Sequence, residues 1–129
     1  MRLKFRAAVS FVLRDAPQDA YLNLGGNFRA ALMHLTEAQV AIIRAWAAAT
    51  PYVDAVRLFG SYARGLAHER SDIDLAVSAD AGHYVALAEE WEHHLTDGLG
   101  QTVHICDFLR NEATRAACSE CSVTLYPTT

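Results

Sequence analysis

Apolar residues in the central part of this chain recur first at helical spacing. Val40, Ile43 and Ala47 form an apolar stripe, and the preceding residues 36–39 match a capping box with a Thr and a Gln three positions apart. Pro51 follows the stripe, and proline cannot continue a helix. The pattern therefore predicts a helix that begins near residue 36 and ends before Pro51.

Four shorter apolar runs then alternate with further helical patterns. The expected strands are residues 53–59, 71–78, 101–108 and 123–126, and the expected helices are residues 61–67, a long helix from residue 84 that Gly98 and Gly100 end, and residues 110–117. We expect Tyr84 and Trp91 on the long helix to be core residues rather than ligand-stacking groups. This order predicts an α/β (α+β) fold, with a small mixed β-sheet and helices packed against it.

Residues 1–34 show no sustained period of either kind and contain Pro17 and Gly25-Gly26. We expect them to form an irregular N-terminal extension, and Met33 is a second candidate start for the native chain. Residues 35–129 then form a single domain, as the length of 129 residues suggests.

Composition narrows the class of protein. Hydrophobic residues make up 52% of the chain and charged residues 20%, as in an ordinary globular protein. The formal net charge of −4 argues against direct nucleic-acid binding, which usually needs a basic face. The first residues faintly resemble a signal peptide, but their apolar stretch is short and is interrupted by Arg14 and Asp15. No apolar run approaches the length of about 20 residues that a membrane-spanning helix needs. We expect a cytoplasmic protein without membrane association.

Three cysteines, Cys106, Cys118 and Cys121, fit that compartment because an odd, sparse set is not a disulfide framework. Cys118 and Cys121 have the spacing of a zinc or redox motif. A structural zinc site needs a second pair of ligands, which Cys106 alone does not supply. We interpret all three as ordinary thiols.

The strongest chemical signal is a Gly60-Ser61 turn followed, after ten residues, by Asp72-Ile73-Asp74. Side chains alternate across a strand, so Asp72 and Asp74 are expected on one face. Two neighbouring carboxylates repel each other unless a cation lies between them, and Mg²⁺ at phosphate-transfer sites is commonly held by one or two carboxylates. The alternative to a metal site is that the two aspartates simply lie in solvent at the edge of a strand.

The Gly60-Ser61 turn supplies the features of a phosphate site. Glycine lets the backbone approach a ligand closely, and free N–H groups at a helix start attract phosphate. Arg64, three residues after Ser61, is a candidate to point at a triphosphate, although it also fits a solvated helix arginine. Together with the two carboxylates, these residues predict a site for a metal-bound nucleoside triphosphate.

This motif resembles the signature of the nucleotidyltransferase superfamily. Its spacing and the size of the chain are most similar to the minimal nucleotidyltransferases, antitoxin-type proteins that are often paired with a HEPN-domain toxin. The resemblance covers about residues 35–126, and its specific part is residues 60–77. It implies the nucleotidyltransferase fold, Mg²⁺ as cofactor and ATP as substrate. It also implies transfer of AMP to a tyrosine hydroxyl of a HEPN toxin within a hetero-oligomer.

Residue by residue, the resemblance implies that Asp72 and Asp74 hold Mg²⁺ while Gly60 and Ser61 cradle the β- and γ-phosphates. The family usually carries a third carboxylate on the strand after the long helix. In this chain His104 occupies that place, and Asp107 matches a second, peripheral acid.

Three interpretations of this difference stay open. His104 acts as a neutral general base, because imidazole exchanges protons near neutral pH. Alternatively, a β-bulge turns Asp107 into the site, since parity otherwise places it on the opposite face. In the third, the acidic group is lost and catalysis is weak or absent.

Two other functions remain possible from the sequence. One is an inactive antitoxin that neutralises its toxin by binding alone, which His104 favours and the intact Gly60 and Asp74 oppose. The other is nucleotidyl transfer to a small molecule such as an aminoglycoside. A template-dependent polymerase is disfavoured, because the sequence offers neither a basic channel nor a second domain.

Overall fold

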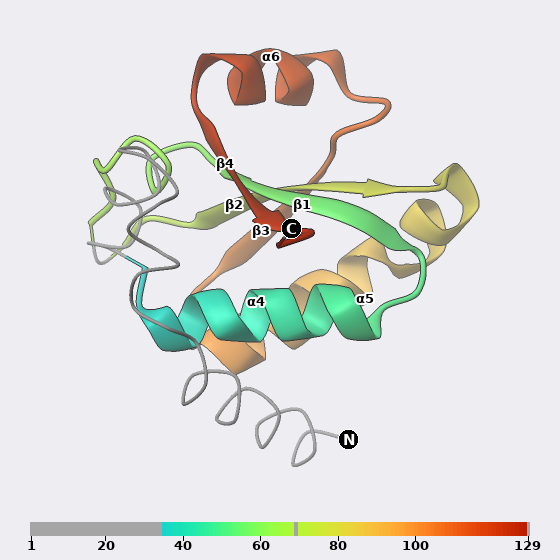
Figure 1. The fold of residues 1–129 in the computed structure, drawn as a ribbon, viewed down its shortest axis with the longest axis horizontal. Helices are drawn as coiled ribbons and strands as arrows, with labels where there is room; N and C mark the ends of the chain where they lie inside the picture. The colour runs from blue at the N-terminus through green and yellow to red at the C-terminus, as the bar shows by residue number, and fades with distance from the viewer. Residues whose placement is uncertain (1–34, 69, 129) are drawn as a thin grey trace.

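A computed structural model describes residues 35–68 and 70–128, so the extension expected over residues 1–34 lies outside the described residues. The elements along the chain are α4 (Glu37–Ala49), β1 (Val53–Phe59), β2 (Ile73–Ala79), α5 (Ala81–Leu99), β3 (Val103–Asp107), α6 (Glu112–Glu120) and β4 (Ser122–Tyr126) (Figure 1). All four expected strands are present, with ends that differ from the predicted ones by at most two residues.

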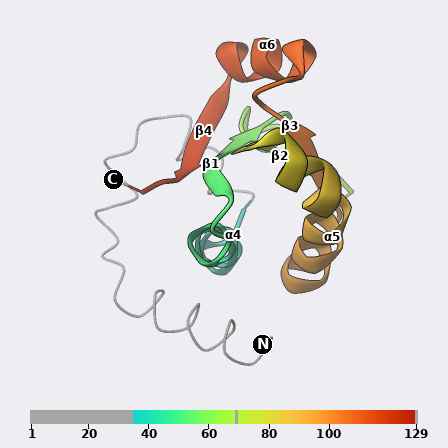
Figure 2. The ribbon, with the colours of Figure 1, turned by 90° about the vertical axis from the view of Figure 1, so that its right-hand side faces the viewer.

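The four strands form one sheet in the order β3-β2-β1-β4. Strands β2 and β3 are parallel, whereas β1 pairs antiparallel with both β2 and β4. Helices α4 and α5 lie against one face of the sheet and α6 lies over the other (Figures 1 and 2). The predicted mixed sheet with packed helices is confirmed.

Helix α4 begins as its sequence predicts. The Thr36 hydroxyl accepts a hydrogen bond from the Gln39 backbone N–H at 3.0 Å, and the Gln39 side chain accepts one from the Thr36 N–H at 3.0 Å. This reciprocal capping box satisfies two donors that a helix start otherwise leaves unpaired. The helix ends at Ala49, before Pro51.

Helix α5 starts earlier than predicted and runs through Gly98. Its N-cap is Asp80, whose carboxylate accepts from the His83 backbone N–H at 3.2 Å. The helix ends at Leu99, and its C-cap is Gly100, where φ is +70° and a glycine is favoured. Trp91 is buried against the core, with its ring centroid 5.7 Å from that of Trp46, which confirms its predicted role. Within the described part of the chain, no helix is long and apolar enough to cross a membrane.

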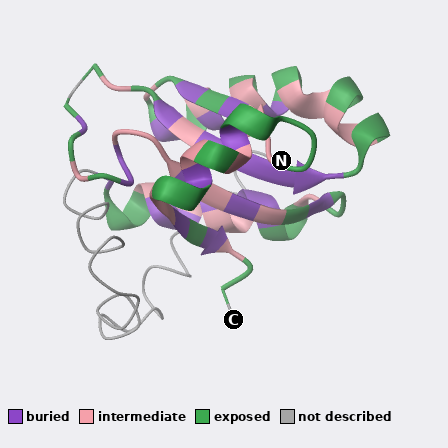
Figure 3. Cartoon of the chain, turned by 90° about the horizontal axis from the view of Figure 1, so that it is seen from above, coloured by how far each residue is buried: buried purple, intermediate pink, exposed green. Residues whose placement is uncertain are grey.

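Strand β2 has buried side chains on both faces of the sheet. Ile73, Leu75 and Val77 are fully buried among the core residues beneath α4 and α5. Each such side chain contributes about 1.5–3 kcal/mol by leaving water. Ala76 and Ser78 are buried on the opposite face, over which α6 lies (Figures 1 and 2). Figure 3 views the molecule from the side of α6, with buried residues in purple. Only the first part of this second face, around Asp74, is less deeply buried.

The segment after β1 corrects one prediction. Residues 61–65 form turns and residues 66–67 are irregular, so this segment is not a short helix. The Arg64 N–H donates a hydrogen bond to the Gly60 carbonyl, four residues earlier. The Gly65 N–H, however, donates to a carbonyl three residues earlier, and the Leu66 N–H donates to one five residues earlier. A helix needs a continuous series of bonds to the fourth residue back. Gly65, at φ +72°, breaks that series.

Candidate functional site

The two halves of the Gly-Ser/Asp-x-Asp motif meet at Gly60 and Asp74. Strands β1 and β2 are antiparallel, and Phe59 at the end of β1 faces Asp74 near the start of β2. The Asp74 carboxylate lies directly over Gly60, where an added Cβ would collide with Oδ2 and lie 3.3 Å from Cγ. Gly60 also has φ of +74°, a backbone conformation that L side chains rarely adopt. The glycine is therefore required both by its backbone conformation and by the carboxylate above it.

The Asp74 carboxylate is held in a partly desolvated position. Its side chain is 27% exposed, and burial is the largest influence, raising the pKa of Asp74 above its ordinary value. The nearby His104 lowers this pKa, and the charge of Asp72 raises it. Asp74 therefore interacts electrostatically with both of the other predicted catalytic residues.

Asp72 differs slightly from its predicted position. It lies one residue before β2 and is exposed, whereas the sequence pattern placed it inside the strand. The influence of its charge on Asp74 nevertheless shows that the two carboxylates share one electrostatic environment. The exposed position of Asp72 lets a ligand reach its oxygens from solvent.

His104 stands beside Asp74 on the next strand. The two residues are register partners across the parallel pair β2 and β3, so their side chains leave the same face. His104 Nδ1 lies 3.8 Å from Asp74 Oδ1, which is too long for a hydrogen bond and within ion-pair range when the imidazole is protonated. The His104 side chain is 63% exposed and can therefore be reached by a second substrate.

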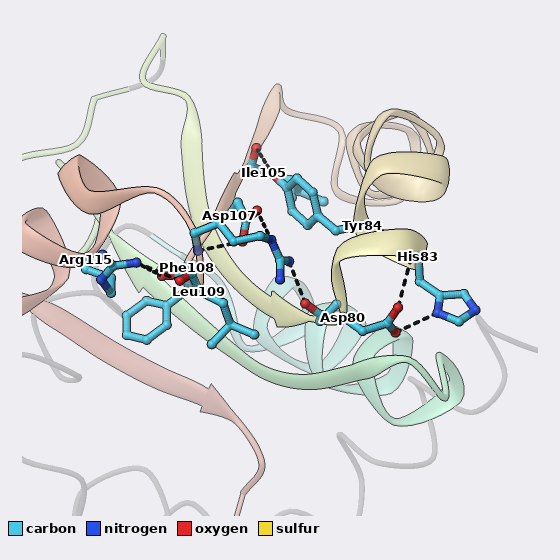
Figure 4. A network of polar contacts seen from close by, with 10 residues as sticks. Asp80, His83, Tyr84, Ile105, Asp107, Phe108, Leu109 and Arg115 are labelled. Carbon is cyan, nitrogen blue, oxygen red and sulfur yellow. Dashed lines mark hydrogen bonds and ion pairs between the residues drawn. The ribbon is translucent and has the colours of Figure 1, made fainter.

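The alternative in which a β-bulge brings Asp107 to the site is wrong. Strand β3 keeps an unbroken register with β2 from Val103 to Asp107. The Asp107 carboxylate accepts a hydrogen bond from Arg110 Nε at 2.7 Å, and the same guanidinium donates to the Ala79 carbonyl at 2.6 Å. Figure 4 shows this network at the end of β2 that is remote from Asp74, together with Tyr84, whose hydroxyl donates to the Ile105 carbonyl. Asp107 therefore stabilises the connection between β3 and α6.

Arg64 lies in the turns after Gly60, but its guanidinium is engaged elsewhere. Its Nη2 atom is 2.8 Å from the Glu120 carboxylate oxygen Oε2 at the end of α6. Both side chains are substantially exposed, at 47% and 71%. The Cys121 thiol donates to the Ala63 carbonyl at 3.4 Å, so the end of α6 contacts these turns at two points. A nucleotide would have to compete with Glu120 for Arg64.

Two residues that the sequence did not single out also border the site. Gln101, just before β3, donates from its side-chain nitrogen to the Tyr62 hydroxyl and to the Ser71 carbonyl, the latter at 2.9 Å. Tyr62 is 3% exposed, and burial raises the pKa of its phenol. No local pattern marks these contacts, because they join positions 30 and 39 residues apart.

The donor atoms of the site suit a hard cation. Asp72 and Asp74 offer carboxylate oxygens, the ligand type that Mg²⁺ prefers, and the space above Gly60 is already shaped around one carboxylate. Among residues 35–68 and 70–128, no three His, Cys, Asp or Glu side chains are grouped so that they could hold a metal ion by themselves. The pair fits Mg²⁺ that completes its coordination with water and phosphate oxygens.

Comparison with known proteins gives one family match. The family model described as polymerase beta, nucleotidyltransferase matches residues 42–126, a range that includes Gly60, Asp74 and His104. No curated protein matches the chain. One similar solved structure, the crystal structure of a toxin-antitoxin with AMP-PNP, is 23% identical over 78% of this chain and 70% of its own, with a TM-score of 0.47. That likeness is too distant to assign a substrate or partner.

Proposed function

Because this chain belongs to the polymerase beta type of nucleotidyltransferase family, we propose that it transfers AMP from ATP to a hydroxyl group. The observation that carries the proposal is the placement of the Asp74 carboxylate directly over Gly60, with His104 in register beside it. The turn, the carboxylate and the imidazole to which we assign phosphate binding, metal binding and proton acceptance therefore lie next to one another.

Each residue has a distinct part in the proposed reaction. The turn at Gly60 and Ser61 receives the β- and γ-phosphates through turn backbone N–H groups and the serine hydroxyl. The acceptor hydroxyl oxygen attacks the α-phosphorus, a new P–O bond forms, and the bond to the bridging oxygen breaks so that pyrophosphate leaves. The exposed His104 imidazole takes the hydroxyl proton.

Asp72 and Asp74 are the residues that would hold Mg²⁺. Neutralisation of charge on the phosphate oxygens is the chemistry that the ion supplies when bound. The two carboxylates fix where that charge is placed relative to Gly60. Partial burial of Asp74 strengthens the electrostatic interaction by excluding water.

We propose that the acceptor is a tyrosine on a partner HEPN toxin, so that this chain is the antitoxin of a pair. The support is the similarity of residues 60–77 to the minimal nucleotidyltransferase antitoxins. The exposure of Asp72 and His104 also suits an acceptor presented by a separate protein.

The test is label transfer. The chain is mixed with Mg²⁺, ATP labelled at the α-phosphate and the product of the adjacent gene, and label is followed on that product. The proposal expects label that disappears with Asp74→Ala. An exposed acid on β1, Asp54, provides the matched control: Asp54→Ala keeps the label. Absence of label with the wild-type chain contradicts protein adenylylation.

A second function, neutralisation of a toxin by binding alone, is favoured by one observation. His104 stands where the resemblance expects a third carboxylate, and a single imidazole removes negative charge from the site. Under this function, the wild-type chain binds the adjacent gene product tightly and no label is transferred.

A further inference from the structure

We infer that Gln101 is a positioning residue that fixes the Gly60-Ser61 turn relative to the acidic segment Asp72–Asp74. The inference rests on the proposed function, because it assigns Gln101 a role in building that nucleotide site. The Gln101 side chain bonds to Tyr62 and Ser71 and not to Asp72 or Asp74.

The first support is the pair of hydrogen bonds from the Gln101 side-chain nitrogen. One goes to the hydroxyl oxygen of Tyr62, the residue that follows Ser61. The other goes to the carbonyl oxygen of Ser71, the residue before Asp72, at 2.9 Å. A primary amide carries two hydrogens, so both bonds form at once. One side chain therefore joins the two halves of the motif, in addition to the β1–β2 pairing that places Asp74 over Gly60.

The second support is where Gln101 itself lies. It precedes β3, three residues before His104, and the adjacent Thr102 carbonyl accepts a hydrogen bond from the Ile73 N–H at 2.9 Å. The start of β3 is thus anchored to the acidic segment by backbone as well as by side chain. Gln101 consequently ties the turn, the acidic segment and the strand that carries His104 to one point.

The third support is the rigidity of the Tyr62 anchor. Tyr62 is 3% exposed and belongs to the hydrophobic core, so its hydroxyl has a fixed position from which the turn is held. Burial raises the pKa of this phenol, and it therefore stays neutral and suited to accept a hydrogen bond at neutral pH. A hydrogen bond to a fixed buried group defines position better than one to an exposed, mobile group.

The test compares Gln101→Ala with Gln39→Ala in the full chain. Gln39 is a matched control, because its side-chain nitrogen also donates to a distant carbonyl, that of Leu99 at 3.3 Å, and its side-chain oxygen closes the α4 capping box. Both variants lose hydrogen bonds of similar kind, but only Gln101 borders the proposed site. Gln101→Glu is a second variant of nearly the same shape that cannot donate.

Two quantities are measured for each variant. The first is amide hydrogen exchange at Leu66, which bonds to Ser61 within the turns, and at Ile73, with α6 amides as internal reference. The second is the Kd for ATP in the presence of Mg²⁺. We expect Gln101→Ala and Gln101→Glu to speed exchange at both amides and to weaken ATP binding by about tenfold or more, since small misplacements of site groups have large effects. Gln39→Ala should change neither quantity.

Two outcomes overturn the inference while leaving the proposed function intact. In one, wild type binds ATP and the Gln101 variants leave exchange at both amides unchanged. In the other, exchange rises but ATP affinity falls no further than in Gln39→Ala, which makes Gln101 a purely structural residue. Failure of wild type to bind ATP with Mg²⁺ contradicts the proposed function itself.

Discussion

His104 and Asp74 are register partners on adjacent parallel strands, with Nδ1 of the imidazole 3.8 Å from Oδ1 of the carboxylate. His104 takes the position where the family resemblance expects an acid. Asp74 is partly buried, with its carboxylate over Gly60. This relationship supports the proposal that His104 accepts the proton of the acceptor hydroxyl.

Replacing His104 separates a working base from a lost acid. If the imidazole accepts the hydroxyl proton, His104→Ala should lower the rate of label transfer by about a hundredfold or more while leaving Mg²⁺-dependent ATP binding nearly unchanged. His104→Asp should also lower the rate. A rate that rises in His104→Asp would show instead that the chain has lost a useful carboxylate.

Gly60→Ala should abolish ATP binding and destabilise the fold. An alanine at φ +74° costs about 1–2 kcal/mol, and its Cβ must also displace the Asp74 carboxylate. Gly100→Ala is the matched control, because Gly100 has φ of +70° and an added Cβ meets nothing within 4 Å. Denaturant unfolding and calorimetry with ATP and Mg²⁺ measure the two effects.

Both glycine variants should therefore lose stability, with the larger loss in Gly60→Ala. Only Gly60→Ala should lose nucleotide binding. Retention of full ATP affinity by Gly60→Ala would contradict the assignment of the turn as the phosphate site.

The ion pair between Arg64 and Glu120 should restrain Arg64 from binding phosphate. Exposed ion pairs contribute only about 0–1 kcal/mol to stability, so Glu120→Gln should hardly change the free energy of unfolding. It should strengthen ATP binding by about two- to fivefold by releasing the guanidinium, whereas Arg64→Gln should weaken it. Titration of both variants with ATP and Mg²⁺ checks this, and unchanged affinity in both would remove Arg64 from the site.

In the absence of metal, the ionised Asp74 carboxylate should lower the free energy of unfolding at neutral pH. Burial raises the pKa of Asp74 in the folded chain, so the folded state holds its proton to a higher pH than the unfolded state does. Stability is then lost as the pH rises from the ordinary value of 3.8 through the raised pKa. Asp74→Asn removes this loss. The variant should be more stable than wild type at pH 7 and should lose that advantage on acidification below the ordinary value.

Urea unfolding in the presence of a chelator measures this difference across the pH range. Asp54→Asn, a change at an exposed acid on β1, should not reproduce the gain. A lower stability for Asp74→Asn at pH 7 would mean that the carboxylate is stabilised by its surroundings rather than strained by burial.

Local sequence patterns predicted most elements because their signals are contained within a few residues. Strand β1 was predicted with its observed ends, since Pro51 precedes it and Gly60 follows it. The start of α5 was missed because residues 81–83 add nothing to the apolar stripe, and only the N-cap Asp80 marks them. The helix expected over residues 61–67 failed because Gly65 breaks the hydrogen-bond series.

The candidate site was predictable to the extent that it follows from strand pairing. Gly60 and Asp74 are brought together because β1 and β2 are antiparallel neighbours. His104 was singled out by the family resemblance, and it lies beside Asp74 because β2 and β3 pair in register. The contacts of Gln101 and of Arg64 could not be predicted, because each joins residues that only the packed fold brings together.

The most direct test of the account is calorimetric titration of the wild-type chain with ATP, with and without Mg²⁺. We expect one binding site with Mg²⁺ and at least about tenfold weaker binding when the ion is chelated or Asp74 is replaced by alanine, since the carboxylate and the phosphates are expected to share the cation. Absence of binding with Mg²⁺ would contradict the account. Equal binding by wild type and Asp74→Ala would contradict it as well.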